Sequence, residues 1–217
     1  MNKYIVELIA TFFLVLIIGL TAVLGLAGDF APLAIGVGLV VLVYMGGHIS
    51  KAHYNPAVTL GVYIRGRCSG KEVLPYFLAE FIGAALAALV VRGVFAGQVT
   101  HNGLTANIEM WTPGASGPII AAEALFTFLL VFVILNVGFS KRTASNEFYG
   151  IAIGFTVLAG AFTVGGISLG SFNPAVTFAL AIMGKMQWSD TWMHLLPQVL
   201  GAVLAAFTFK GLYPDDK

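Results

Sequence analysis

Charge is scarce in this sequence. Only 10% of its 217 residues are Asp, Glu, Lys or Arg, whereas about 25% is usual for a soluble domain. The formal net charge is +1, so the chain lacks the basic surface that binds nucleic acid. Cys68 is the single cysteine and the four histidines are scattered, so we expect no disulfide framework, metal site or cofactor. These shortages exclude a soluble globule and a nucleic-acid-binding protein.

The sequence is rich in long apolar runs. Six runs reach the roughly 20 residues that a helix needs to cross the hydrocarbon core of a membrane. They cover roughly residues 4–26, 32–48, 72–95, 118–139, 148–166 and 189–213. The first run is longer than the apolar part of a signal peptide, so we expect it to be retained. The sequence predicts an all-α, multi-pass membrane protein.

The cations are distributed unevenly between the two sides that six spans create. With the N-terminus inside, nine lie on the cytoplasmic side: Lys3, Lys51, Arg65, Arg67, Lys71, Lys141, Arg142, Lys210 and Lys217. Only Arg92 and Lys185 fall on the outer side. Since Lys and Arg favour the cytoplasmic side, both termini are predicted to be cytoplasmic, in a plasma or inner membrane.

The two halves of the chain repeat each other. Glu7, Thr11 and Phe12 return as Glu123, Thr127 and Phe128 at an offset of 116, and residues 55–59 return as residues 173–177 at an offset of 118. Each half has three spans, so the second copy enters the membrane from the opposite side. The predicted organisation is a first inverted repeat (1–97), an extracellular connecting loop (98–117) and a second inverted repeat (118–217).

Each half also contains an apolar run too short to span. Asn is a favoured N-cap and Pro a favoured first helical residue, so Asn55-Pro56-Ala57 and Asn173-Pro174-Ala175 predict two helix starts. The helices, about 56–64 and 174–183, would be re-entrant half-helices about 13–15 Å long, roughly half the hydrocarbon thickness. Their positive N-terminal ends would meet near the midplane, repelling cations and protons while the Asn amides donate to water. This pattern predicts a pore.

These features resemble the aquaporin, or major intrinsic protein, family over essentially the whole chain. The resemblance rests on the two Asn-Pro-Ala signatures, the Glu-x-x-x-Thr-Phe stretches at Glu7 and Glu123, and Gly47-His48-Ile49-Ser50 with His53. It implies a homotetramer in membrane lipid with one pore per subunit, passing water or small neutral solutes. Glycerol, urea, ammonia and hydrogen peroxide are candidate solutes.

Several polar residues lie near the two motifs. Glu7 and Glu123 are expected to accept hydrogen bonds from the re-entrant loop of their own half, and His53 to brace the first loop as a donor; a proton relay is the alternative for the glutamates. Glu80 stands where the family usually has glutamine, and its repeat counterpart is Gln198. His48 and Lys51 could line the cytoplasmic vestibule, with gating or a surface position as alternatives for Lys51.

The sequence departs from the family at the outer selectivity filter. The family usually has arginine directly after the second Asn-Pro-Ala, and this chain has Val176. The other filter positions, matched by spacing from the motifs, are Ile35, Ala161 and Gly170. None is aromatic, His or Arg, so the resemblance implies a filter that is wider and more apolar than that of a strict water channel.

Two other classes of function remain open. A gated ion channel or a secondary transporter can use inverted repeats and broken helices, but it would be expected to have charged sites at the midplane. A non-conducting structural membrane protein could use the same scaffold without flux. An enzyme is not expected, because no nucleophile, base and oxyanion group recur at one depth.

Overall fold

The computed structural model describes residues 1–216; Lys217, one of the cations assigned to the cytoplasmic side, lies outside the described residues. The structure is helical apart from one small hairpin. In chain order the elements are α1 (Asn2–Ile18), η1 (Gly19–Val23), η2 (Gly28–Phe30), α2 (Ala31–Ser50), α3 (Pro56–Arg65), α4 (Gly70–Val90), η3 (Val91–Phe95), β1 (Thr100–His101), β2 (Leu104–Thr105), α5 (Ser116–Gly138), η4 (Lys141–Thr143), α6 (Tyr149–Ser168), α7 (Pro174–Met183), η5 (Trp188–Asp190) and α8 (Trp192–Leu212).

Six helices are long and apolar enough to cross a membrane, counted over the described residues 1–216. They cover Asn2–Val23, Gly28–Ser50, Gly70–Phe95, Ser116–Gly138, Tyr149–Ser168 and Trp188–Leu212. The predicted all-α membrane fold is confirmed, with ends that differ by a few residues from the apolar runs. The chain is a multi-pass integral membrane protein.

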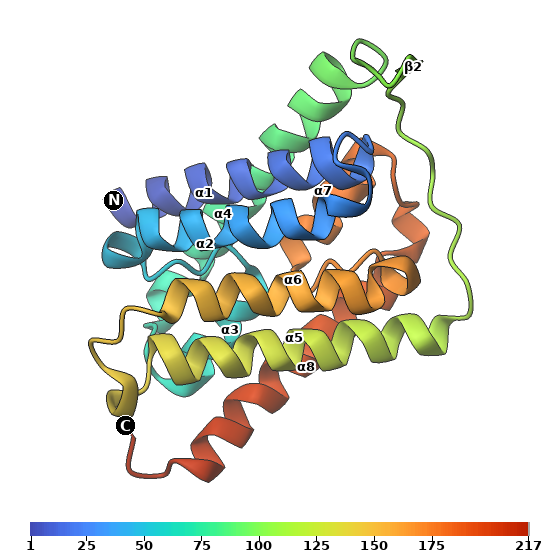
Figure 1. The fold of residues 1–217 in the computed structure, drawn as a ribbon. Helices are drawn as coiled ribbons and strands as arrows, with labels where there is room; N and C mark the ends of the chain where they lie inside the picture. The colour runs from blue at the N-terminus through green and yellow to red at the C-terminus, as the bar shows by residue number, and fades with distance from the viewer. Residues whose placement is uncertain (217) are drawn as a thin grey trace.

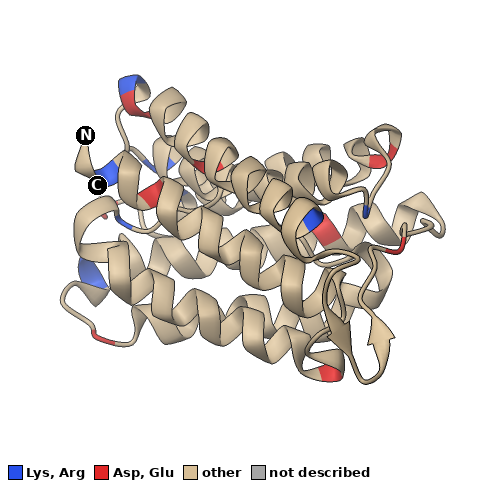
Figure 2. Cartoon of the chain, turned by 90° about the horizontal axis from the view of Figure 1, so that it is seen from above, with Lys and Arg blue, Asp and Glu red and all other residues tan. Residues whose placement is uncertain are grey.

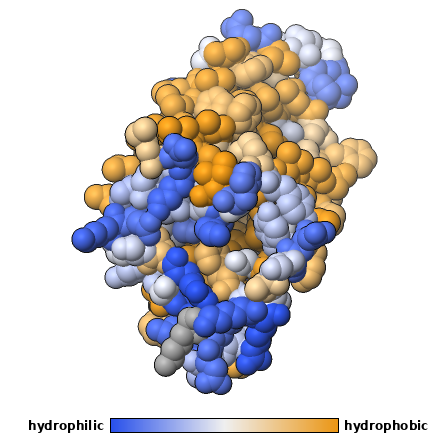
Figure 3. All heavy atoms as spheres, turned by 90° about the vertical axis from the view of Figure 1, so that its left-hand side faces the viewer, coloured by the Kyte–Doolittle hydropathy of each residue, from blue (hydrophilic) through white to orange (hydrophobic). Residues whose placement is uncertain are grey.

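The long helices run between two ends of the molecule (Figure 1). One end holds both termini and residues 139–148, and we call it the terminal face; the other holds residues 96–115 and is called the hairpin face. Figure 2 shows that the charged residues gather at these two ends, with few between them. Figure 3 looks onto the terminal face, where hydrophilic residues are bordered by apolar ones. This is the distribution that a spanning protein needs, because charge at membrane depth is costly.

A short hairpin lies within residues 98–117, where the sequence predicts only a connecting loop. Strands β1 and β2 pair Thr100 with Thr105 and His101 with Leu104. The turn residues Asn102 and Gly103 both have positive φ, 50° and 78°, as a two-residue type I′ turn requires.

Small residues let the long helices approach closely. A Cβ atom on Gly83 of α4 would lie 2.3 Å from the carbonyl oxygen of Leu8 in α1, and one on Gly201 of α8 would lie 2.5 Å from that of Ala124 in α5. These two glycines are counterparts at the 118-residue offset. Backbone-to-backbone packing of this kind is how membrane helices associate without a hydrophobic driving force.

Two short helices, α3 and α7, lie among the long ones, on the terminal and hairpin sides respectively (Figure 1). Each has 10 residues and begins at an Asn cap whose side-chain oxygen accepts a hydrogen bond from the N–H two residues on, at 2.9 Å. The predicted half-helices are thus present, with α3 one residue longer than expected. Both end at a glycine in the left-handed region, Gly66 and Gly184, where only glycine is free of strain.

A buried carboxylate ties the terminal face together. Asp216 is 5% exposed and lies 2.9 Å from the Arg65 guanidinium at the end of α3. It also accepts hydrogen bonds from the Ser140 hydroxyl and the Lys141 N–H in the segment after α5. The Ser140 hydrogen bond is the main cause that lowers the pKa of Asp216, and the Lys141 N–H and the charges of Arg65 and Arg67 lower it further. The end of the chain is thereby attached to α3 and to the α5–α6 connection.

Candidate pore

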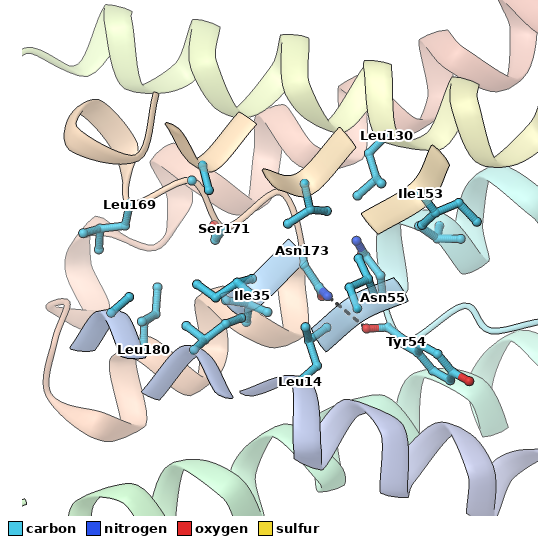
Figure 4. Close-up of a pocket in the computed structure, with 18 of the residues that line it drawn as sticks. Leu14, Ile35, Tyr54, Asn55, Leu130, Ile153, Leu169, Ser171, Asn173 and Leu180 are labelled. Carbon is cyan, nitrogen blue, oxygen red and sulfur yellow. Dashed lines mark hydrogen bonds between the residues drawn. The ribbon is translucent and has the colours of Figure 1, made fainter. Parts of the chain in front are cut away.

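The two Asn caps are cross-linked at the centre of the molecule. The Asn55 amide donates a hydrogen bond to the carbonyl oxygen of Phe172, and the Asn173 amide donates to that of Tyr54, both at 2.9 Å. Figure 4 shows Asn55 and Asn173 side by side, with the bond to Tyr54 dashed. An amide NH2 has two N–H groups, so each Asn retains a second donor. Both side chains line a cavity.

The cavity has a volume of about 100 Å³, and about 10–15 Å³ is enough to hold one water. Most of its lining residues form pairs at the repeat offsets of 116 or 118. The pairs are Leu14 and Leu130, Ile18 and Ile134, Ile35 and Ile153, Leu39 and Val157, Val43 and Ala161, Ala52 and Gly170, His53 and Ser171, Asn55 and Asn173, and Val58 and Val176. Aliphatic walls therefore extend to both sides of the Asn pair.

The four residues matched to the family filter all line this cavity: Ile35, Ala161, Gly170 and Val176. A Cβ on Gly170 would lie 3.5 Å from the Cα of Ala161, so the second re-entrant loop runs directly against α6. Val176, 3% exposed, also packs in a buried apolar cluster with residues of α1 and α4. The set offers no charge and no aromatic ring.

Unusual backbone conformations position the two re-entrant loops. Lys51 and Tyr54 in the first loop have φ of 72° and 51°, and their counterparts Leu169 and Phe172 in the second have φ of 63° and 45°. Residues other than glycine rarely adopt the left-handed region, and each such residue costs about 1–3 kcal/mol and persists only where the surroundings enforce it. The loops therefore need strong tertiary contacts.

Two buried glutamates supply those contacts. The Glu7 carboxylate accepts hydrogen bonds from the N–H groups of His53 and Tyr54, at 3.0 and 2.6 Å. Glu123 accepts from the N–H groups of their counterparts, Ser171 at 3.1 Å and Phe172 at 2.9 Å. Each loop is held by the first helix of its own half, which is the arrangement that the sequence predicts for these glutamates.

Polar side chains of α4 and α8 contact matching threonines, Thr59 and Thr177, in the two halves. In the second half, the Gln198 amide donates to Glu123 at 2.8 Å and to Thr177 at 3.0 Å. In the first half Glu80 takes the place of the glutamine, and the Thr59 hydroxyl donates to it at 2.7 Å. The side-chain Nδ1 of His53 lies 2.9 Å from the Thr59 hydroxyl.

Two further side chains hold the re-entrant loops, and the sequence did not predict their role. The Tyr76 hydroxyl of α4 donates to the carbonyl of Ser50 at 2.7 Å. His194 of α8 holds the carbonyl of Ser168 through Nε2 at 2.8 Å. Tyr76 and His194 are 118 residues apart, so two chemically different side chains do the same task. The 118-residue offset pairs the two positions, but Tyr and His differ chemically, so their shared role could not be recognised from the sequence.

Wider vestibules adjoin the cavity at each end. On the terminal face, one of about 270 Å³ is lined by His48 and Lys51, the residues expected there, and by Ser140 and Asn146. On the hairpin face, one of about 370 Å³ is lined by hairpin residues and by Lys185. Lys185 also lines the central cavity, a position that its place in the sequence did not suggest.

Known proteins share both this sequence pattern and this fold. The chain is 39% identical over 202 residues to the probable aquaporin AqpM of Archaeoglobus fulgidus, covering 90% of this chain and 81% of that protein. It is 34% identical to the glycerol uptake facilitator protein-like 6 of Lactiplantibacillus plantarum, with all of both chains covered. The X-ray structure of the aquaglyceroporin from Plasmodium falciparum shares the fold, with a TM-score of 0.79 at 22% identity over 98% of this chain and 96% of that one. A sequence model of the family described as major intrinsic protein matches residues 1–163 and 119–217. The paired half-helices, the loops held by Glu7 and Glu123 and these matches agree, and the chain belongs to the major intrinsic protein family.

Proposed function

We propose that the central cavity is a pore for water and for uncharged solutes somewhat larger than water. As a member of its family the chain is a passive transmembrane channel for water and small solutes, and not an enzyme. We further propose that its outer selectivity filter is wide and apolar. The observation that carries it is that Ile35, Ala161, Gly170 and Val176 line one cavity and contribute neither a ring nor a cation. Glycerol and urea are the solutes that we expect such a filter to admit.

Few of the groups that line the pore can form hydrogen bonds with a passing solute. The second N–H of each Asn amide can replace one hydrogen bond that a solute loses on leaving water. The aliphatic walls on both sides replace none, so the remaining hydrogen bonds of glycerol or urea have to come from carbonyl groups of the re-entrant loops and from water in the pore. Ions are disfavoured most strongly, because every ion loses hydration and a cation is also repelled by the positive N-terminal ends of α3 and α7.

The cross-links at the centre favour a channel over a transporter. A transporter works by rocking one repeat against the other around a site at the interface. Here such a motion would break both Asn-to-carbonyl bonds, Asn55 to Phe172 and Asn173 to Tyr54. A buried donor or acceptor left unpaired costs about 1–3 kcal/mol. A static passage needs no such motion.

The remaining expectations about assembly and organisation are part of the same proposal. We place the terminal face in the cytoplasm because most Lys and Arg residues lie on its side. The halves 1–97 and 118–217 are proposed as inverted repeats joined by an extracellular segment, 98–117. The protein is proposed to be a homotetramer in lipid, as its family resemblance implies; light scattering of the purified protein measures this.

The proposed filter is tested by introducing the arginine that the family usually has directly after the second Asn-Pro-Ala. Val176→Arg adds both length and a fixed positive charge to the cavity wall. We expect glycerol and urea permeabilities of proteoliposomes to fall about tenfold more than water permeability, equivalent to about 1.4 kcal/mol of extra barrier. Stopped-flow light scattering measures all three.

Val176→Met is the matched control, because it adds length without charge. It should narrow the pore but leave any proton leak unchanged, whereas Val176→Arg should reduce that leak. If Val176 only packs against neighbouring helices, Val176→Arg will misfold or change every permeability by one factor. A folded Val176→Arg protein with an unchanged solute-to-water ratio removes Val176 from the filter. Equal flux in protein-containing and empty vesicles, for every solute, rejects the channel itself.

A further inference from the structure

Lys185 lies where the pore opens onto the hairpin face. It lines both the central cavity and the hairpin-face vestibule. Among the cavity-lining residues of the described chain, 1–216, it is the only Lys, Arg, Asp or Glu. Glu109 and His101 line the vestibule but not the cavity. The lining of the cavity itself, within the described residues, therefore carries a single formal charge, at its hairpin-face end.

The backbone of Lys185 is fixed on two sides. Its N–H donates to the carbonyl of Leu180 at 2.9 Å, which completes the turn that Gly184 makes at the end of α7. Its own carbonyl accepts a hydrogen bond from the N–H of Trp111 at 2.7 Å. Residue 185 is thus held at the mouth by both α7 and the connecting segment that carries the hairpin.

The counterpart of Lys185 in the first half has a different environment. Arg67 occupies the equivalent turn after α3, 118 residues earlier, with its N–H bonded to the carbonyl of Val62 at 3.0 Å. Its guanidinium lies 3.7 Å from the buried carboxylate of Asp216. Within residues 1–216 no carboxylate forms an ion pair with Lys185, which is half-buried. Glu109 lines the same vestibule without forming an ion pair with Lys185, so the Lys185 charge is not neutralised by direct contact and can act on a solute that enters the mouth.

We propose that Lys185 is a specificity-determining residue that excludes cations from the hairpin-face mouth without narrowing it. The inference rests on the proposed function, because it assigns to Lys185 the charge that Val176 does not provide at the filter. A positive charge at the mouth repels a cation through the partly hydrated space, whereas an uncharged solute of the same shape passes unaffected. Size selection and charge selection are then carried by different residues.

Urea and guanidinium are the probes that separate these two effects. Both are small, planar and similar in size, and guanidinium carries a charge that urea lacks. We expect Lys185→Gln to raise guanidinium permeability of proteoliposomes about fivefold, the factor for one unit charge at about 8 Å and an effective dielectric constant of about 40. Urea permeability should stay within about twofold, since removing one charge changes little for a neutral solute. Labelled-solute uptake measures both.

Two control variants accompany Lys185→Gln. Arg92→Gln removes the other cation on the hairpin side, which donates to the carbonyl of Ile182 at 3.0 Å and lines neither cavity nor vestibule; it should leave the urea-to-guanidinium ratio unchanged. Lys185→Arg keeps the charge and should also keep the ratio. Salt provides the second readout, because the Debye length falls from about 30 Å at 0.01 M to about 3 Å at 1 M. The effect of Lys185→Gln should therefore shrink at high salt.

The inference is overturned if folded Lys185→Gln protein passes urea normally and guanidinium no faster than wild type. It is also overturned if both probes change by one common factor, or if the effect persists in 1 M salt, since either result means that Lys185 only shapes the mouth. Failure of the proposed function looks different, because wild-type vesicles would then show no urea flux above empty vesicles.

Discussion

The sharpest consequence of the loop architecture concerns Glu123. Its Oε1 accepts hydrogen bonds from the Ser168 hydroxyl and the Ser171 N–H, and its Oε2 from the Ser171 hydroxyl, the Phe172 N–H and the Gln198 amide. The carboxylate is 0% exposed, so it accepts these hydrogen bonds out of contact with bulk water. We predict that Glu123→Gln is tolerated better than Glu123→Leu.

The size of the difference follows from the donors left unpaired. In Glu123→Gln one oxygen still accepts, and the new NH2 faces a single backbone N–H, which costs about 1–3 kcal/mol. In Glu123→Leu both backbone N–H groups, of Ser171 and Phe172, lose their acceptor, which doubles the cost to about 2–6 kcal/mol. The carbonyl of Phe172 is also the acceptor for Asn55, so a displaced loop weakens the central junction as well.

The assay combines the melting temperature of the purified protein with its water permeability in vesicles. Wild type should melt highest, Glu123→Gln lower and Glu123→Leu lowest, with permeability falling in the same order. Glu147→Gln, in an exposed position, is the control for loss of one carboxylate and should match wild type. A Glu123→Leu protein that behaves like wild type would refute the bracing role. A Glu123→Gln protein that melts normally but carries no water would replace it with a titrating role.

Two further predictions concern packing and the terminal face. Gly83→Ala puts a methyl group against the carbonyl of Leu8, so we expect a loss of about 1–3 kcal/mol from overpacking, measured as a lower melting temperature; Gly211→Ala, where nothing lies within 4 Å, should show no such loss. Asp216→Asn weakens the attachment to Arg65 and should raise hydrogen exchange in residues 139–148 at neutral pH. Because the pKa of Asp216 is lowered in the folded protein, its contribution to stability is present above the unfolded pKa and is lost as the pH falls through the folded one. Wild type at strongly acidic pH should therefore approach the exchange of Asp216→Asn, and equal exchange in both proteins at neutral pH would contradict the attachment.

The spans and half-helices could be predicted because their causes are local. A run of apolar residues from Tyr4 onward has to cross the membrane whatever surrounds it, and Asn-Pro specifies a helix start through its own side chains. The Asn102-Gly103 turn is just as local, and it could have been predicted from that dipeptide. The equivalence of Glu7 and Glu123 follows from the 116-residue offset between the halves, which needs only the amino-acid sequence.

Other features depend on residues far away in the chain and left no local signal. Nothing at Lys51 or Leu169 favours a left-handed backbone; contacts made elsewhere in the fold enforce it. The role of His194 emerges only when its ring is seen to reach Ser168. The position of Lys185 at the pore mouth depends on how α7 ends and on where the connecting segment crosses, which spacing in the sequence does not encode.

The two hydrogen bonds from Asn55 and Asn173 can form only after both re-entrant loops have been synthesised. Asn55 is synthesised 117 residues before its partner, Phe172. Until the second loop enters the membrane, the amide of Asn55 and the carbonyl of Tyr54 lack their partners, and the loop between α2 and α3 lacks its two hydrogen bonds to the second half. The N-terminal half therefore waits in an unfinished state while residues up to 173 emerge from the ribosome, and it is then that quality-control factors and proteases can engage it. A nascent chain halted before residue 172 should be far easier to degrade than one halted after the second loop has inserted.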